Sequence, residues 1–113
     1  MRVHDLHDSE GRVFAFEVSN VMLGRRGVRR VVLRIPNARI LSFRERAEEF
    51  CEFELDGTKF VAWEPWNDNS RFWIGSKAAP ATPTPHLSKV REAFERARPA
   101  LGFLLPARDP DLE

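Results

Sequence analysis

The sequence predicts an α+β domain in which two helices pack on one face of a single antiparallel sheet. Three observations predict this class: several short segments alternate apolar and polar residues, an Asp-Gly pair joins two apolar runs, and two segments repeat apolar residues at helical spacing. At 113 residues the chain has a common length for one domain. We therefore expect a single domain over residues 1–113 with the element order β-α-β-β-β-β-α.

The composition favours a folded protein. Apolar residues make up 42% of the chain, and nine phenylalanines and three tryptophans supply material for a core, so the class of disordered proteins is excluded. No apolar run approaches the roughly 20 residues that a membrane-spanning helix needs, so we expect no membrane partner. The first eleven residues are too polar for a secretion signal, and Cys51 has no second cysteine to bond. We expect a cytoplasmic protein.

The first elements follow a strand pattern and then a helical one. Residues 12–18 alternate, with Phe14, Phe16 and Val18 on one face, and residues 2–6 can form a short strand before the turn at 8–11. Valines and an isoleucine then recur at helical spacing, which predicts a helix that ends at Pro36-Asn37 and is followed by a strand over 38–43. A strand over residues 25–35 stays open as an alternative, because Gly24, Gly27 and the valines disfavour a helix.

The clearest element is a hairpin around Asp56-Gly57. A two-residue type I′ turn needs positive φ at both positions, which this pair tolerates. The turn sets the register, in which Leu55 faces Thr58, Glu54 faces Lys59, Phe53 faces Phe60, Cys51 faces Ala62 and Phe50 faces Trp63. One face of the hairpin is then core material, and Val61 and Trp63 lie on the other face.

The segment EPWNDNSRFWIG, residues 64–75, predicts a second hairpin with a longer loop at 67–70 and a return strand at 71–74. A proline-rich connector at 78–86 leads to a C-terminal helix that is capped at Thr84-Pro85. His86 is a second candidate for this cap. The helix has an apolar stripe and a Glu92–Arg96 pair, and Pro99 ends it. We expect residues 103–105 to dock on the domain, and the polar residues 106–113 are typical of a mobile tail.

Two groups of side chains around the second hairpin are candidates for binding. The loop offers polar side chains and an arginine to a ligand, although Arg71 can instead stack on Trp66 or pair with Glu64, and the loop residues can simply close the turn. Exposed aromatics on an open sheet face form a platform for a partner, unless the tail or a second copy of the chain covers them. We expect the loop to be mainly structural and the tryptophans to carry any interaction. The binding candidates are Trp63, Trp66, Asp68, Asn69, Arg71 and Trp73.

A block of basic residues adjoins a block of acidic ones. Residues 24–44 contain seven arginines and no acid, and residues 45–56 contain six acids and one arginine. One interpretation is that the two blocks attract each other across the fold. The other is that a basic patch of Arg25, Arg26, Arg29 and Arg30, within the block at 25–34, binds nucleic acid or an acidic protein.

Catalytic and metal-binding patterns are weak. His4 and His7 lie near acids, but their spacing is not typical of metal ligands, and Cys51 on an inward strand face is typical of a core residue. No phosphate loop, nucleophile elbow or paired-cysteine motif occurs. We therefore expect no cofactor and no metal, and the sequence indicates no enzymatic activity.

The segments EPWNDNSRFWIG, CEFELDG and LGRRGV…IPNARIL together resemble a group of short bacterial proteins of unassigned function, over roughly residues 12–76. This resemblance implies no functional residue. The expected function is a small non-catalytic binding domain that uses an aromatic sheet face with an arginine rim. Its expected partner is another protein or a second copy of itself, and nucleic-acid binding by the arginine block with tryptophan stacking is the alternative.

Overall fold

The computed structural model describes residues 1–65, 70–78 and 81–98, and these form an α+β domain with one antiparallel sheet of six strands and two helices. The strands are β1 (His4–His7), β2 (Val13–Ser19), β3 (Ala38–Phe43), β4 (Glu49–Leu55), β5 (Thr58–Trp63) and β6 (Arg71–Ser76). The helices are α1 (Asn20–Leu33) and α2 (Leu87–Arg96). The predicted class is confirmed. The predicted order left out the short strand that residues 2–6 can form, and the structure has this strand as β1, shifted to residues 4–7.

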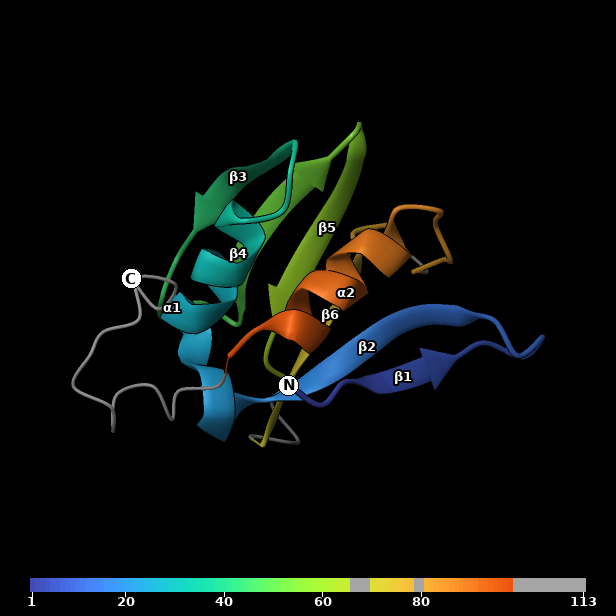
Figure 1. Ribbon diagram of the computed structural model, residues 1–113, viewed down its shortest axis with the longest axis horizontal. Helices are drawn as coiled ribbons and strands as arrows, with labels where there is room; N and C mark the ends of the chain where they lie inside the picture. The colour runs from blue at the N-terminus through green and yellow to red at the C-terminus, as the bar shows by residue number, and fades with distance from the viewer. Residues whose placement is uncertain (66–69, 79–80, 99–113) are drawn as a thin grey trace.

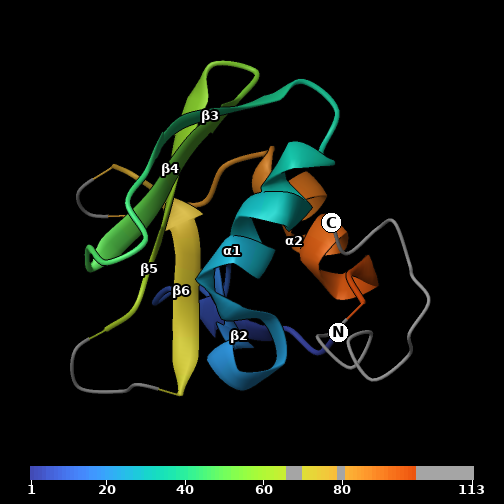
Figure 2. The ribbon, with the colours of Figure 1, turned by 90° about the vertical axis from the view of Figure 1, so that its left-hand side faces the viewer.

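The sheet is built from two antiparallel units that meet in its centre. Its strand order is β1-β2-β6-β5-β4-β3, so β6 lies between the first hairpin and the β3–β4–β5 meander (Figure 1). The β2–β6 contact joins residues far apart in the sequence, with Ala15 opposite Gly75. Both helices lie on the same side of the sheet, where they pack side by side (Figure 2).

The expected helix over the valine stripe is confirmed. All four stripe residues, Val28, Val31, Val32 and Ile35, are buried, although Ile35 lies just beyond the last helical turn. α1 kinks at Gly24, whose φ of 71° is not helical, so its first turn points differently from the rest. The burial of the stripe decides between helix and strand, because a strand would have exposed part of it.

The Asp-Gly hairpin is confirmed as well. Asp56 and Gly57 have φ values of 50° and 87°, and the register runs from Leu55 opposite Thr58 to Cys51 opposite Ala62, as predicted. One pair was wrong: Trp63 lies opposite Glu49, not opposite Phe50. The reason is a β-bulge at this point of β4, which places Phe50 and Cys51 both toward the core.

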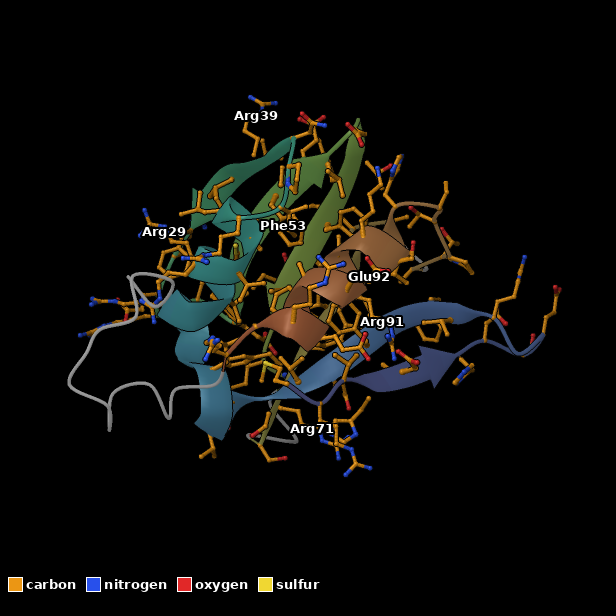
Figure 3. The ribbon with its side chains drawn as sticks, in the orientation of Figure 1. Arg29, Arg39, Phe53, Arg71, Arg91 and Glu92 are labelled. Atoms are coloured by element: carbon orange, nitrogen blue, oxygen red, sulfur yellow. The ribbon has the colours of Figure 1, made fainter. Side chains whose placement is uncertain are left out.

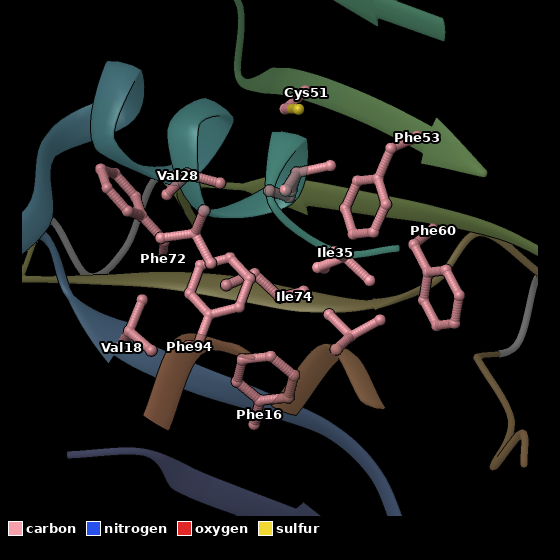
Figure 4. Close-up of a cluster of buried hydrophobic side chains, with 14 of the residues drawn as sticks. Phe16, Val18, Val28, Ile35, Cys51, Phe53, Phe60, Phe72, Ile74 and Phe94 are labelled. Carbon is pink, nitrogen blue, oxygen red and sulfur yellow. The ribbon is translucent and has the colours of Figure 1, made fainter. Parts of the chain in front are cut away.

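The core lies between the helices and one face of the sheet (Figure 4). Aromatic rings dominate it: Phe50 packs on Phe72 at 4.9 Å between ring centroids, and Phe16 packs on Phe94 of α2 at 5.5 Å. The α2 stripe residues Leu87, Val90 and Phe94 are buried, as the helical spacing predicted. Ring pairs at these distances stabilise the fold beyond the apolar area that they bury, and the Phe16–Phe94 pair holds α2 on the sheet.

The start of α2 differs from the prediction. The helix begins at Leu87, with His86 at the N-cap position, two residues later than the Thr84-Pro85 cap implies. The Thr84 hydroxyl still accepts a hydrogen bond from the His86 backbone N–H at 3.0 Å, so it satisfies a donor of the preceding turn. The side chain of His86 makes no capping hydrogen bond and lies 3.8 Å from Asp56. The predicted docking of residues 103–105, the stop at Pro99 and the tail at 106–113 lie outside the described residues.

Candidate functional site

The sheet face away from the helices carries two tryptophans side by side. Trp63 of β5 and Trp73 of β6 are directly opposite each other, and their ring centroids are 6.0 Å apart at an angle of 58°. Both side chains are partly exposed. We call this surface the tryptophan face; its residues are Leu6, Ala15, Glu17, Val61, Trp63, Arg71, Trp73 and Gly75.

Small residues next to the tryptophans let one ring lie flat on the sheet. A Cβ placed on Gly75 would come within 2.8 Å of Trp73 Cη2 and of the Cβ of Ala15. The Trp73 ring therefore lies over the Gly75 backbone, in a space that a side chain would fill. Val61, which lies opposite Gly75, is only 5% exposed although it faces away from the core.

Ion pairs lie along the sheet face that carries the tryptophans. Arg71 pairs with Glu17 at 3.2 Å, Lys77 with Glu52 at 2.9 Å, and Arg39 with Glu54 at 2.6 Å. Arg39 and Arg71 lie at opposite ends of the sheet, as Figure 3 shows. Of the two alternatives for Arg71, the pair with Glu64 is replaced by the pair with Glu17, because β2 lies beside β6, and Glu64 pairs with Arg25 instead. The other alternative, stacking on Trp66, lies outside the described residues. The Glu54 carboxylate faces Lys59 in the register but accepts its hydrogen bond from Arg39.

His4 of β1 lies next to the tryptophan face. It lies opposite Glu17, and its pKa is lowered by burial and by the positive charges of Arg71 and Arg2. A lowered pKa keeps the imidazole neutral at physiological pH. The sequence pointed to no role for His4 or Glu17 here, because only the pairing of β1 with β2, and of β2 with β6, brings them near Trp73.

The predicted loop site is only partly within the described chain. Trp66, Asp68 and Asn69 lie outside the described residues, so their proposed contacts stay a prediction. Arg71 is described: it is the first residue of β6, and its guanidinium pairs with Glu17 of β2. The structure thus brings Trp63, Trp73 and Arg71 together on adjacent strands.

The arginine patch does not form one uniform surface. Arg25 is turned inward: it pairs with Glu64 at 2.8 Å, donates to the carbonyl oxygens of Glu45 and Ala47, and lies over the Phe50 ring. Arg26 pairs with Glu45 at 3.0 Å. The guanidinium of Arg29 lies 5.3 Å from the centroid of the Phe43 ring. Arg30 is partly exposed, and no ion pair joins it to another described residue.

These contacts agree with the expected attraction between the basic and acidic blocks. Arg26 meets Glu45 and Arg39 meets Glu54, so one residue of each pair comes from each block. Both arginines are largely exposed, and exposed ion pairs contribute little to the free energy of unfolding, so these two pairs add little to the stability of the domain.

The remaining candidates show no site among the described residues. Burial raises the pKa of the Cys51 thiol to about 12, so it is a neutral core group. Among the described residues, no three acids, histidines or cysteines are grouped so that they could hold a metal ion. Neither described helix is long and apolar enough to cross a bilayer.

Comparisons of the chain with protein-family models, with curated proteins and with solved structures found no match. The function therefore has to be argued from the site alone.

Proposed function

We propose that this protein is a small non-catalytic binding domain that contacts another protein, or a second copy of itself, through the tryptophan face. The observation that carries the proposal is the Trp63–Trp73 pair, which lies partly exposed on the sheet face that neither described helix covers. Tryptophan is enriched at the energetic centres of protein interfaces, because it buries a large area with few rotatable bonds.

The charged pairs around the tryptophans fit the rim of such an interface. Arg71 and Arg39 each pair with a glutamate on the neighbouring strand, and Lys77, just after β6, pairs with Glu52 of β4. Partly exposed ion pairs can be broken at little cost. A bound protein can therefore pair its acids with these cations, or its basic residues with these glutamates. Ala15 and Gly75 have no large side chains that would cover the neighbouring tryptophan rings, which leaves these rings accessible to a partner.

The test compares Trp63→Ala and Trp73→Ala with Val21→Ala. Val21 is 79% exposed and lies at the start of α1, so it controls for loss of an exposed apolar side chain elsewhere. We expect sedimentation, or capture of partners from the native cell followed by their identification, to show an interaction that both tryptophan variants weaken at least about tenfold and that the control keeps. Thermal melts check that each variant is folded. An interaction that all three variants retain would contradict the proposal.

Nucleic-acid binding stays the alternative prediction, and the contacts of the arginine patch give it no added support. Arg25 has its guanidinium bonded within the protein, so it offers less to a phosphate than its neighbours do. Titration of labelled oligonucleotides at low and moderate salt tests this alternative, because phosphate contacts make the affinity fall steeply with salt. Substitution of Arg26, Arg29 and Arg30 by alanine should then weaken binding to all sequences alike.

A further inference from the structure

A second surface lies between the two helices. A groove of about 490 Å³ has described lining residues from α1, from the turn that follows it, and from α2 with the two residues after it. This volume lies within the range of about 300–1,000 Å³ that is common for ligand sites. The tryptophan face is on the other side of the sheet, so the groove is a separate site (Figure 2).

The base of the groove is apolar. Val31 and Ile35 of the α1 stripe reach it and are almost fully buried, and Ala93 and Ala97 on the α2 side are small. Small alanine side chains leave the space between the helices that a larger residue would fill. An apolar base of this kind favours apolar side chains of a ligand over water.

The described part of the rim carries more cations than acids. Arg34, Lys89, Arg96 and Arg98 line the groove, and Glu92 is the carboxylate among its described lining residues. Lys89 and Arg96 are seven residues apart on α2, which puts them on one side of the helix and about 10 Å apart along its axis. A chain with carboxylates spaced by about this length can pair with both.

These two cations can be recruited by a ligand. Lys89 is 3.8 Å from Asp56 and Arg96 is 3.4 Å from Glu92, and the side chains of Lys89 and Arg96 are 62% and 79% exposed. Pairs so exposed are weak and screened by solvent, so an incoming carboxylate can replace the present partner at little cost.

We propose that the groove between α1 and α2 binds a peptide segment of another protein that carries apolar side chains and at least two carboxylates. The apolar side chains lie on Val31, Ile35 and Ala93, and the carboxylates pair with Lys89 and Arg96. The inference does not depend on the proposed function of the tryptophan face, because the two surfaces share no residue.

The test measures fluorescence anisotropy of a labelled synthetic peptide with the full chain. The probe is a designed peptide that does not occur in this chain: it carries leucine and phenylalanine side chains and two glutamates three residues apart, about 10 Å in an extended chain. A matched probe carries glutamine at both glutamate positions. The protein variants are the charge reversals Lys89→Glu with Arg96→Glu, and the control Arg12→Glu in the β1–β2 turn, where the cation is also exposed.

We expect the double reversal and the neutral probe each to weaken binding by about tenfold or more, while Arg12→Glu and Trp63→Ala leave it unchanged. Equal weakening by Arg12→Glu would mean general charge attraction and would overturn the proposal. No binding of either probe at low salt would also overturn it, including the case in which the chain's own C-terminal segment fills the groove. Self-association that the double reversal abolishes would identify a second copy as the occupant, again against the proposal.

Discussion

The guanidinium of Arg25 and the carboxylate of Glu64 form an ion pair of 2.8 Å that joins α1 to the end of β5. The second carboxylate oxygen of Glu64 accepts a hydrogen bond from the Asn20 side chain, also at 2.8 Å. Arg25 additionally donates to backbone carbonyls of the β3–β4 turn and lies over Phe50. One side chain thus holds three segments together, and the kink at Gly24 precedes it directly.

Arg25→Ala should therefore destabilise the domain. The Arg25 and Glu64 side chains are only 22% and 19% exposed, so the substitution removes the ion-pair partner of a partly buried carboxylate and the arginine donor of two carbonyls. We expect the free energy of unfolding to fall by about 2 kcal/mol in urea titrations. The matched control is Arg26→Ala, whose side chain is 71% exposed and should cost at most about 0.5 kcal/mol. Equal losses for the two variants would show that Arg25 has no structural role beyond its charge.

Gly57→Val should destabilise the β4–β5 hairpin. Gly57 has a φ of 87°, which a β-branched residue adopts only with strain, so we expect a loss of about 1–2 kcal/mol in thermal or urea unfolding. Gly57→Asn is the control, because asparagine tolerates positive φ and should cost less. An unchanged melting temperature for the valine variant would contradict the type I′ turn.

Gly75→Ala should move the Trp73 ring. The new Cβ would meet Trp73 Cη2 and the Cβ of Ala15 at 2.8 Å, closer than such atoms approach, so the ring must lift from the sheet. We expect a loss of about 1–3 kcal/mol and a shift of the tryptophan emission toward that of exposed indole. In a Trp73→Ala background the same glycine substitution should cost less, since one of the two clashes is gone. An identical cost in both backgrounds would mean that the ring does not lie on Gly75.

Cys51 should stay unreactive in the folded protein. Because burial raises its pKa from 9.0 to about 12, the thiol remains neutral at pH 8 and should react with an aromatic disulfide reagent only as fast as the domain unfolds. The pKa of the Cys51 thiol is higher in the folded than in the unfolded protein. Its neutral form therefore stabilises the fold fully below pH 9, and this stabilisation is lost as the pH rises from about 9 toward 12. Cys51→Ala should reduce the loss of stability in this window. Rapid labelling at pH 8 without unfolding would contradict the burial.

Sequence reasoning was successful where the determining contacts are local. The Asp56-Gly57 turn and the apolar spacing of α1 are both contained within a few residues, so the hairpin register and the helix could be predicted. The position of Trp63 on the face away from Phe53 and Phe60 followed from the same register. The partner of that tryptophan, Trp73, could be proposed because β6 follows β5 directly.

Features that depend on distant segments could not be predicted. Nothing near Arg71 in the sequence indicates Glu17, because the β2–β6 pairing alone brings them together. The bulge at Phe50 shifts the register by one residue, and Phe50 then packs against Phe72 in the core. The spacing of apolar residues along the sequence does not reveal this contact. Likewise, the groove combines the end of α1 with α2, two elements that the whole β3–β6 stretch separates.

The central place of β6 has a consequence for synthesis of the protein on the ribosome. The N-terminal hairpin emerges first, but the neighbour that completes its hydrogen bonding, from Ala15 opposite Gly75 to Ser19 opposite Arg71, emerges more than fifty residues later. The meander of β3, β4 and β5 can pair as soon as it leaves the exit tunnel, because its contacts are close in the chain. Until β6 arrives, β2 keeps an unprotected edge, and the nascent chain is exposed to wrong pairing with other chains during that interval.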